Sequence, residues 1–241
     1  MKRLAHYSQY FLRNPDFIKE LIGHTSIKPR DTVLDIGAGS GVISSVLAKR
    51  AKDVIAIEFE PRMAEKLREN MQEYPNVTVR EGDFLEMPLP KGAYKIFANI
   101  PFHLSSPIVR KITEADNPPE ATYLIVQKQF ANKLLPASDR FTGQLGMMIG
   151  PLFAVKIRRP LRKTDFWPHP NVDTVLLELI RREEPMIALK DMPKYRKFIE
   201  GCFSDPKIFV KTPREAVGLK PDIKPSQMKL VEWVRLFEQA K

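Results

Sequence analysis

Two hydrophobic patterns alternate along the first part of the chain. Short apolar runs, which are typical of buried strands, alternate with segments whose apolar positions recur at helical spacing. The runs are "TVLDI" (32–36), "DVIAIE" (53–58), "NVTVRE" (76–81), "YKIFANI" (94–100) and "ATYLIVQ" (121–127). Strands that alternate with helices predict a parallel, doubly wound sheet. We therefore expect an α/β domain.

The pattern changes after Gly150. The segments "LFAVKIR" (152–158) and "TVLLELIRR" (174–182) predict an antiparallel pair that closes the sheet. Beyond Glu184 the apolar spacing becomes helical, and the last helix is expected to begin at Ser226 as its N-cap. The sequence thus predicts an α/β domain over residues 1–182 and a small all-helical domain over residues 183–241.

Composition restricts the domain size and the cellular compartment of the protein. The chain has 241 residues, 43% of them hydrophobic, which suffices for one large domain with a small appendage. The single cysteine, Cys202, excludes an intrachain disulfide and suits a reducing compartment. The longest apolar run, residues 145–155, is far shorter than the roughly 20 residues that span a bilayer. We expect a monomeric cytoplasmic protein without a membrane segment.

Basic residues are concentrated near the C-terminus. The net charge is +10, and residues 181–241 carry 14 basic and 9 acidic side chains, half of that charge in a quarter of the chain. A second basic stretch, "KIRRPLRK", covers residues 156–163. A solvated basic surface and a nucleic-acid partner both explain this charge, whereas an anionic membrane surface is disfavoured because no strongly amphipathic basic helix accompanies it.

The ends of three predicted strands carry residues that suit a nucleoside. Gly37, Gly39 and Gly41 of "DIGAGSG" follow the first strand and open a helix, where glycines let a ligand approach the backbone. Their spacing differs from the dinucleotide pattern G-x-G-x-x-G. Glu58 ends the next strand, where a carboxylate accepts ribose hydroxyls. Asp83 follows the third strand, placed to accept from an adenine amino group, with Phe84 beside the ring.

The stretch "NIPF", Asn99 to Phe102, ends the fourth strand at the same edge of the sheet. A structural turn is one explanation. A functional explanation is that the Asn99 amide oxygen accepts from the exocyclic amine of a nucleobase and aims its lone pair at an electrophile, while Phe102 stacks on the base. The set suits a flipped-out base beside a methyl donor. The four histidines show no ligand spacing, so we expect no metal.

Taken together, these motifs resemble those of the ribosomal RNA adenine N6-dimethyltransferases, which use S-adenosylmethionine. The resemblance covers most of the first 180 residues, from "HYSQYFLRNP" through "DIGAGSG", "IEFEP", "EGDF", "NIPFHLSSPIVRKI" and "YLIVQKQFANKL" to "DFWPHPNVDTVLLEL". It implies a Rossmann-like methyltransferase sheet, S-adenosylmethionine as cofactor and ribosomal RNA as partner.

The resemblance also implies roles for individual residues. Gln9, Tyr10 and Leu12 would border the donor, Gly37 and its neighbours would face its methionine part, Glu58 its ribose, and Asp83 with Phe84 its adenine. The segment Asn99, Ile100, Pro101 and Phe102 would hold the target amine, and Phe166 would supply a second aromatic face. One departure is Tyr10, which stands where the family has asparagine.

The short C-terminal segment resembles the large-subunit (23S, macrolide-resistance) methylases more than the small-subunit enzymes. We therefore expect methylation of large-subunit RNA and macrolide-lincosamide-streptogramin resistance. The alternatives are a small-subunit (16S) rRNA dimethyltransferase in ribosome maturation, a non-catalytic RNA-binding assembly protein, and a methyltransferase acting on small molecules or DNA, which the basic tail and the "DFWPHP" loop disfavour.

Overall fold

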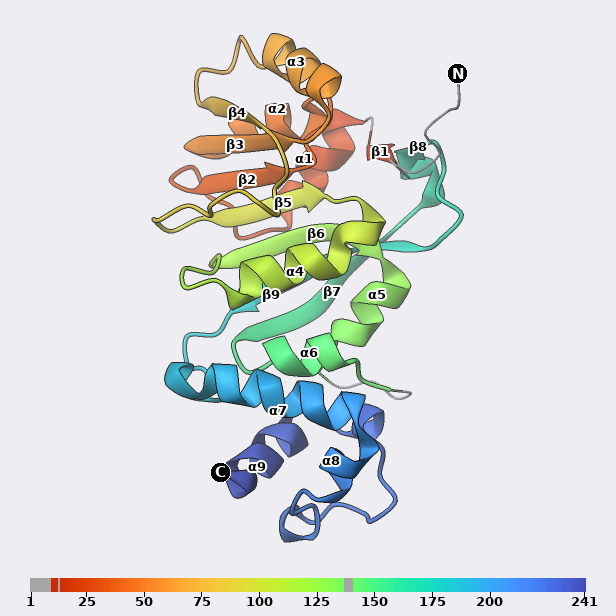
Figure 1. The fold of residues 1–241 in the computed structure, drawn as a ribbon. Coiled ribbons are helices and arrows are strands. Elements are labelled where there is room, and N and C mark those ends of the chain that lie inside the picture. The colour runs from red at the N-terminus through yellow and green to blue at the C-terminus, as the bar shows by residue number, and fades with distance from the viewer. Residues whose placement is uncertain (1–9, 13, 137–140) are drawn as a thin grey trace. The chain divides into compact units, whose positions relative to one another are not determined.

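A computed structural model describes residues 10–12, 14–136 and 141–241 (Figure 1). The chain divides into two compact units. Unit 1 comprises residues 1–128 and 157–178, and unit 2 comprises residues 129–156 and 179–241. Among the described residues, no helix has both the length and the apolar character needed to cross a membrane.

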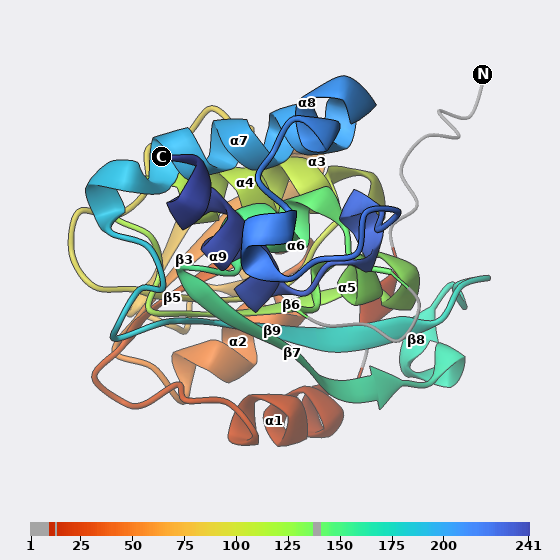
Figure 2. The same cartoon turned by 90° about the horizontal axis from the view of Figure 1, so that it is seen from below.

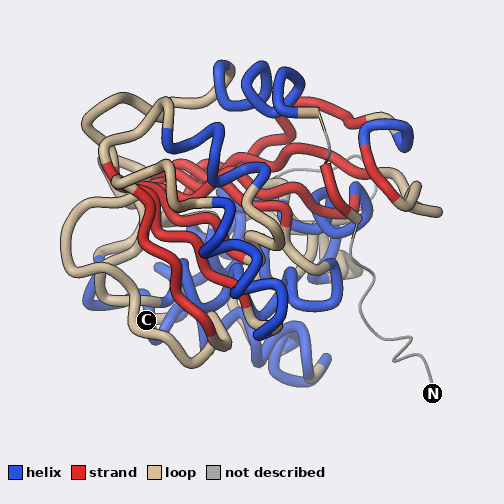
Figure 3. Tube along the Cα trace, turned by 90° about the horizontal axis from the view of Figure 1, so that it is seen from above, coloured by secondary structure: helices blue, strands red, loops and turns tan. Residues whose placement is uncertain are grey.

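Unit 1 is built on a parallel sheet. Its strands are β2 (Thr32–Ile36), β3 (Asp53–Glu58), β4 (Val77–Glu81), β5 (Lys95–Asn99) and β6 (Ala121–Gln127). The pairs β2 with β3, β3 with β4, β2 with β5 and β5 with β6 are all parallel. Figure 3 shows these strands running side by side as one layer. The predicted strands are therefore confirmed, within one residue at either end.

The complete sheet has seven strands in the order β4-β3-β2-β5-β6-β9-β7, where β7 is Phe153–Leu161 and β9 is Thr174–Arg181. The two closing strands predicted after Gly150 are thus neighbours at one edge. A separate two-stranded antiparallel sheet joins β1 (Phe11–Leu12) to β8 (Phe166–Trp167).

Helices cover both faces of the sheet, which confirms the doubly wound architecture. They are α1 (Pro15–Gly23), α2 (Val42–Ala48), α3 (Pro61–Asn70) and α4 (Ser105–Glu114). Figure 2 shows α1 and α2 together on one face and α4 on the other. Each of α1 and α3 begins with a proline in its first turn and a side-chain cap, from Asn14 and Glu60 respectively.

Unit 2 is mainly helical, and its helices are α5 (Lys128–Leu134), α6 (Gln144–Ile149), α7 (Met192–Ser204), α8 (Pro206–Val210) and α9 (Leu230–Ala240). The first residue of α5 is the last residue of the first segment of unit 1. Its core joins Met147 and Met148 of α6 to side chains of α7 and α9. Tyr195 donates its hydroxyl hydrogen to the Met147 carbonyl oxygen at 3.0 Å. The boundary therefore differs from the one expected near residue 182, because residues 129–156 and 179–182 also belong to unit 2. Among these residues, Met147 and Met148 of α6 complete the core of the C-terminal helices.

The last helix begins later than expected. α9 starts at Leu230, and its preceding residue Lys229 forms a capping arrangement with Glu232. The predicted cap at Ser226 is wrong, because residues Pro225–Gln227 form a separate 3₁₀ turn. The buried face of α9 consists of Leu230, Trp233, Leu236 and Phe237.

Candidate active site

A cavity of about 330 Å³ lies in unit 1 at the carboxyl ends of its strands. The strand order explains its position. The chain runs outward from β2 to β3 and β4, then returns to place β5 on the other side of β2. Such a reversal opens a crevice at the carboxyl ends of the two central strands, where α/β proteins bind ligands. The volume is within the range of small-molecule sites.

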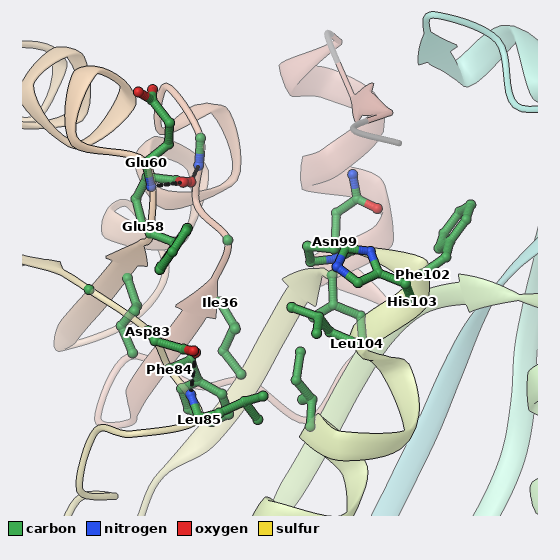
Figure 4. Close-up of a pocket in the computed structure, with 18 of the residues that line it drawn as sticks. Ile36, Glu58, Glu60, Asp83, Phe84, Leu85, Asn99, Phe102, His103 and Leu104 are labelled. Carbon is green, nitrogen blue, oxygen red and sulfur yellow. Dashed lines mark hydrogen bonds between the residues drawn. The ribbon is translucent and has the colours of Figure 1, made fainter. Parts of the chain in front are cut away.

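Glu58, the last residue of β3, is held by two backbone amides. Its Oε2 accepts from the Gly39 N–H at 2.8 Å and its Oε1 accepts from the Glu60 N–H at 2.9 Å, as Figure 4 shows. The side chain is only 4% exposed. Two N–H donors fix the carboxylate and leave each oxygen a further lone pair for a ligand hydroxyl.

The loop after β4 is fixed from two sides. Asp83 Oδ1 accepts from the Leu85 N–H at 2.8 Å. From α4, the Lys111 ammonium donates to the Leu85 carbonyl oxygen at 2.7 Å and lies 5.6 Å from the centre of the Phe84 ring. These contacts order the Asp83 and Phe84 side chains before any ligand binds, which lowers the entropy cost of binding.

Asn99, at the end of β5, faces these acids across the cavity (Figure 4). Its Nδ2 donates to the backbone carbonyl oxygen of Tyr10. The Tyr10 ring in turn lies 5.4 Å from the Phe102 ring, centre to centre, at an interplanar angle of 31°. The amide contact with Tyr10 fixes Asn99 so that its Oδ1 remains as an acceptor.

A further carboxyl group, that of Asp35, lies in β2 within the sheet, close in sequence to the glycine turn. Asp35 is fully buried in β2, and its Oδ2 accepts from the Ser44 hydroxyl at 2.7 Å. Its Oδ1 has no hydrogen-bond partner among the described residues. Burial raises the pKa of Asp35 to about 7, and repulsion from the Glu58 carboxylate adds to the rise.

Most of the predicted site residues line this one cavity: Tyr10, Gly37, Gly39, Glu58, Asp83, Phe84, Asn99, Ile100, Pro101 and Phe102. Gln9 lies outside the described residues. Three predicted residues do not line it, namely Leu12, Gly41 and Phe166.

Each of these three departures has a packing reason. Leu12 and Phe166 pair across the β1–β8 sheet and are both buried, at 3% and 2% exposure. Gly41 is the N-cap of α2 in a left-handed conformation, with φ of 93°. A Cβ there would lie 2.7 Å from side-chain atoms of Leu67 and Met71, so Gly41 serves the packing of α2 against α3.

Several lining residues were missed from the sequence, among them Phe11, Phe59, His103 and Leu104. Phe59 directly follows Glu58 and is 57% exposed. An aromatic residue immediately after a strand-end carboxylate is a signal in the sequence that could have been interpreted as a stacking surface. Phe11 gave no such signal, because its pairing with β8 is a long-range contact.

The cavity fits an adenosyl cofactor. Fixed carboxylates of Glu58 and Asp83 suit ribose hydroxyls and an adenine amino group, and Phe59 and Phe84 offer aromatic surface. The acidic lining also suits a ligand that carries a sulfonium and an ammonium group. Nearby, the left-handed glycines Gly37 and Gly39 keep the turn free of side chains.

Comparison with known proteins agrees with this geometry. Residues 2–211 match the family model described as ribosomal RNA adenine dimethylase. The chain is 30% identical over 207 residues to ribosomal RNA small subunit methyltransferase A of Latilactobacillus sakei, covering 81% of this chain and 69% of that protein. It is also 30% identical over 246 residues to the rRNA adenine N-6-methyltransferase of Saccharopolyspora erythraea, covering 97% and 64%.

Among solved structures, the 23S rRNA methyltransferase ErmE superposes with a TM-score of 0.82 at 29% identity, covering 95% of this chain and 99% of that one. This agreement confirms the fold class predicted from the sequence. The enzymatic relatives also remove the non-catalytic alternative. The chain therefore belongs to the ribosomal RNA adenine dimethylase family of S-adenosylmethionine-dependent methyltransferases.

Proposed function

We propose that this protein methylates N6 of a flipped-out adenine in large-subunit (23S) ribosomal RNA, and that the modification confers macrolide-lincosamide-streptogramin resistance. The observation that carries the chemistry is the placement of Asn99 and Phe102 across one cavity from Glu58 and Asp83. A base-binding half and a nucleoside-binding half thus meet in a single site.

Asn99 has the central positioning role. An exocyclic amine is a weak nucleophile because its lone pair is delocalised into the ring. Asn99 Oδ1 accepts a hydrogen of the target amine and directs the lone pair toward the donor, while the bond from Nδ2 to Tyr10 keeps the amide from rotating. Phe102 offers the stacking surface for the base.

The donor-binding residues complete the arrangement. S-adenosylmethionine, when bound, supplies an electrophilic methyl group. Glu58 binds the ribose hydroxyls, Asp83 accepts from the adenine amino group, and Phe59 with Phe84 borders the adenine ring. No side chain has to act as a strong base, because the methylated amine loses its proton readily.

The large-subunit substrate is supported by the match to ErmE, in which 99% of that chain is covered. Small-subunit RNA is the second candidate, favoured by the identity to small subunit methyltransferase A proteins. Length does not separate the two candidates, since the chain covers 69% and 76% of these proteins and 64% of the rRNA adenine N-6-methyltransferase of Saccharopolyspora erythraea.

Mapping adenine methylation by mass spectrometry, in rRNA from a bacterial host with and without the protein, tests the proposal. We expect one new N6-methylated adenine in large-subunit RNA, together with raised macrolide tolerance. Expression of Asn99→Ala is the matched control and should strongly reduce both. New methylation confined to small-subunit RNA would select the second candidate, and unchanged rRNA would refute both.

A further inference from the structure

Trp167 is an exposed aromatic residue close in the fold to the candidate active site. The indole side chain is 53% exposed, although tryptophan is usually largely buried. Its neighbour Phe166 is 2% exposed. The "DFWPHP" segment thus presents the tryptophan, and not the phenylalanine, to the surroundings.

The pairing of β1 with β8 explains this reversal. Leu12 pairs with Phe166, and Phe11 pairs with Trp167. Residues directly opposite in an antiparallel pair point to the same side, and successive residues point to opposite sides. Leu12 and Phe166 therefore share the buried side, whereas Trp167 shares its side with Phe11.

Phe11 connects this side of the small sheet to the cavity. It lines the cavity, and its ring would lie 3.3 Å from a Cβ placed on Gly39. Because directly paired residues have Cβ atoms about 4.5–5.5 Å apart, Trp167 lies one residue pair away from the cavity wall. The indole is therefore beside the candidate active site and outside its lining.

The surroundings of Trp167 are basic. Arg162, Lys163 and His169 are exposed in the same loop, with 78% of the Arg162 side chain accessible. The His169 ring packs edge-on against the indole at 5.7 Å and 83°. Asp165 is paired with Arg162 at 3.2 Å and offsets part of the Arg162 charge, although its own side chain is only 7% exposed. An aromatic surface beside cations is the arrangement that binds single-stranded nucleic acid.

We propose that Trp167 is a stacking platform for an unpaired base of the substrate RNA that flanks the target adenine, with Arg162 and Lys163 near the adjoining phosphates. This inference rests on the proposed function. It gives the loop a substrate-positioning role distinct from the contacts of Asn99 and Phe102.

Substitution of Trp167 tests the platform. Trp167→Ala should weaken binding of an rRNA fragment roughly 5- to 150-fold, the range that corresponds to loss of one stacked base. Trp167→Phe, which keeps a ring, should retain most of the affinity, and Trp167→Leu, which keeps apolar bulk, should not. S-adenosylmethionine binding, measured by calorimetry, should be unchanged in all three. Leu189→Ala, at an exposed apolar residue of unit 2, is the control and should bind RNA as wild type does.

A cycle with modified RNA locates the contact. Two rRNA fragments are made, each lacking the base on one side of the mapped methylation site. One of the two should bind wild type more weakly than intact RNA does. On that fragment, Trp167→Ala should cause no further loss of affinity. The platform would be overturned if wild type and Trp167→Ala bound RNA equally well, or if Trp167→Ala lost as much affinity on the abasic fragments as on intact RNA. The proposed function would still stand in either case, provided that wild type methylates rRNA. A wild-type protein that methylates no rRNA would overturn both.

Discussion

The side-chain amide of Asn99 donates to the backbone carbonyl oxygen of Tyr10. The contact joins the segment before β1 to the end of β5, residues far apart in sequence. It also gives Tyr10 a role that does not depend on its side-chain type, because the carbonyl is present in any residue. The tyrosine found where the family has asparagine is therefore compatible with this contact, and its ring packs near Phe102.

This contact leads to a prediction for Asn99→Asp. A carboxylate cannot donate to the Tyr10 carbonyl, and it would place negative charge against that oxygen. We expect methyl transfer by Asn99→Asp to be as slow as by Asn99→Ala or slower, with both reduced about 10²- to 10³-fold, the usual cost of losing a positioned polar contact. Single-turnover methylation of an rRNA fragment measures this.

RNA binding by both Asn99 variants provides the control, since it should change much less than the rate. If Asn99→Asp keeps a rate between those of wild type and Asn99→Ala, the bond to Tyr10 is dispensable and only the acceptor oxygen matters.

Asp35 should make stability depend on pH. Its pKa is raised to about 7 in the folded chain, chiefly by burial, whereas an unfolded aspartate titrates near 4. Between about pH 4 and pH 7 the folded chain therefore holds a proton that the unfolded chain has lost, so this group's contribution to stability falls as pH rises through that window and levels off above it.

Asp35→Asn removes this dependence, and its amide oxygen still accepts from the Ser44 hydroxyl. Relative to wild type, its free energy of unfolding should rise between about pH 4 and pH 7, by at most about 1.4 kcal/mol per pH unit. Urea denaturation across this range measures the difference. Asp222→Asn, at an exposed carboxyl of unit 2, controls for the loss of one charge, and parallel curves for wild type and Asp35→Asn would contradict the raised pKa.

The strands of the sheet, and the site residues at their carboxyl ends, could be predicted from the local pattern of apolar residues. Strands buried on both faces are continuous apolar runs, so β3 and β6 were located from the sequence to the residue. Once the strands are placed, parallel order brings their carboxyl ends to one edge. Glu58, Asp83 and Asn99 could therefore be assigned to one cavity before the structure was known.

The features that could not be predicted from the sequence depend on packing between segments that are distant in the chain. The direction of Phe166 and Trp167 depends on a two-residue strand, where a shift of one residue exchanges the buried and exposed sides. The partner of α6 likewise depends on contacts with α7, which its own short segment does not encode. Gly41 was assigned to the cofactor because it belongs to the glycine turn, whereas its neighbours show a packing role.

The packing role of Gly41 predicts a stability effect. Gly41→Ala forces a left-handed backbone onto a residue with a Cβ and crowds Leu67 and Met71. We expect the free energy of unfolding to fall by about 1–3 kcal/mol. Gly92→Ala is the matched control, because nothing lies within 4 Å of its Cβ position and its φ is not positive, and it should change stability little. Equal unfolding midpoints of the two variants would show that the α2 turn relaxes without cost.

The basic charge of unit 2 can be tested without truncation. Removing residues 183–241 would uncover Met147 and Met148, so loss of binding by such a fragment could reflect misfolding. We propose instead that unit 2 docks on rRNA phosphates through exposed lysines such as Lys207 and Lys211.

Neutralisation of these two lysines should change the salt dependence of RNA binding. Both lysines are exposed, so Lys207→Gln with Lys211→Gln should preserve the fold. If each contacts one phosphate, the slope of log affinity against log salt should fall by about 0.7–0.9 per lysine. Binding of an rRNA fragment over a salt series measures the slope. The pair Lys19→Gln with Lys66→Gln removes the same charge from exposed helix positions of unit 1 and should leave the slope closer to that of wild type. An equal change in both double variants would mean that net charge alone, and not docking by unit 2, governs binding.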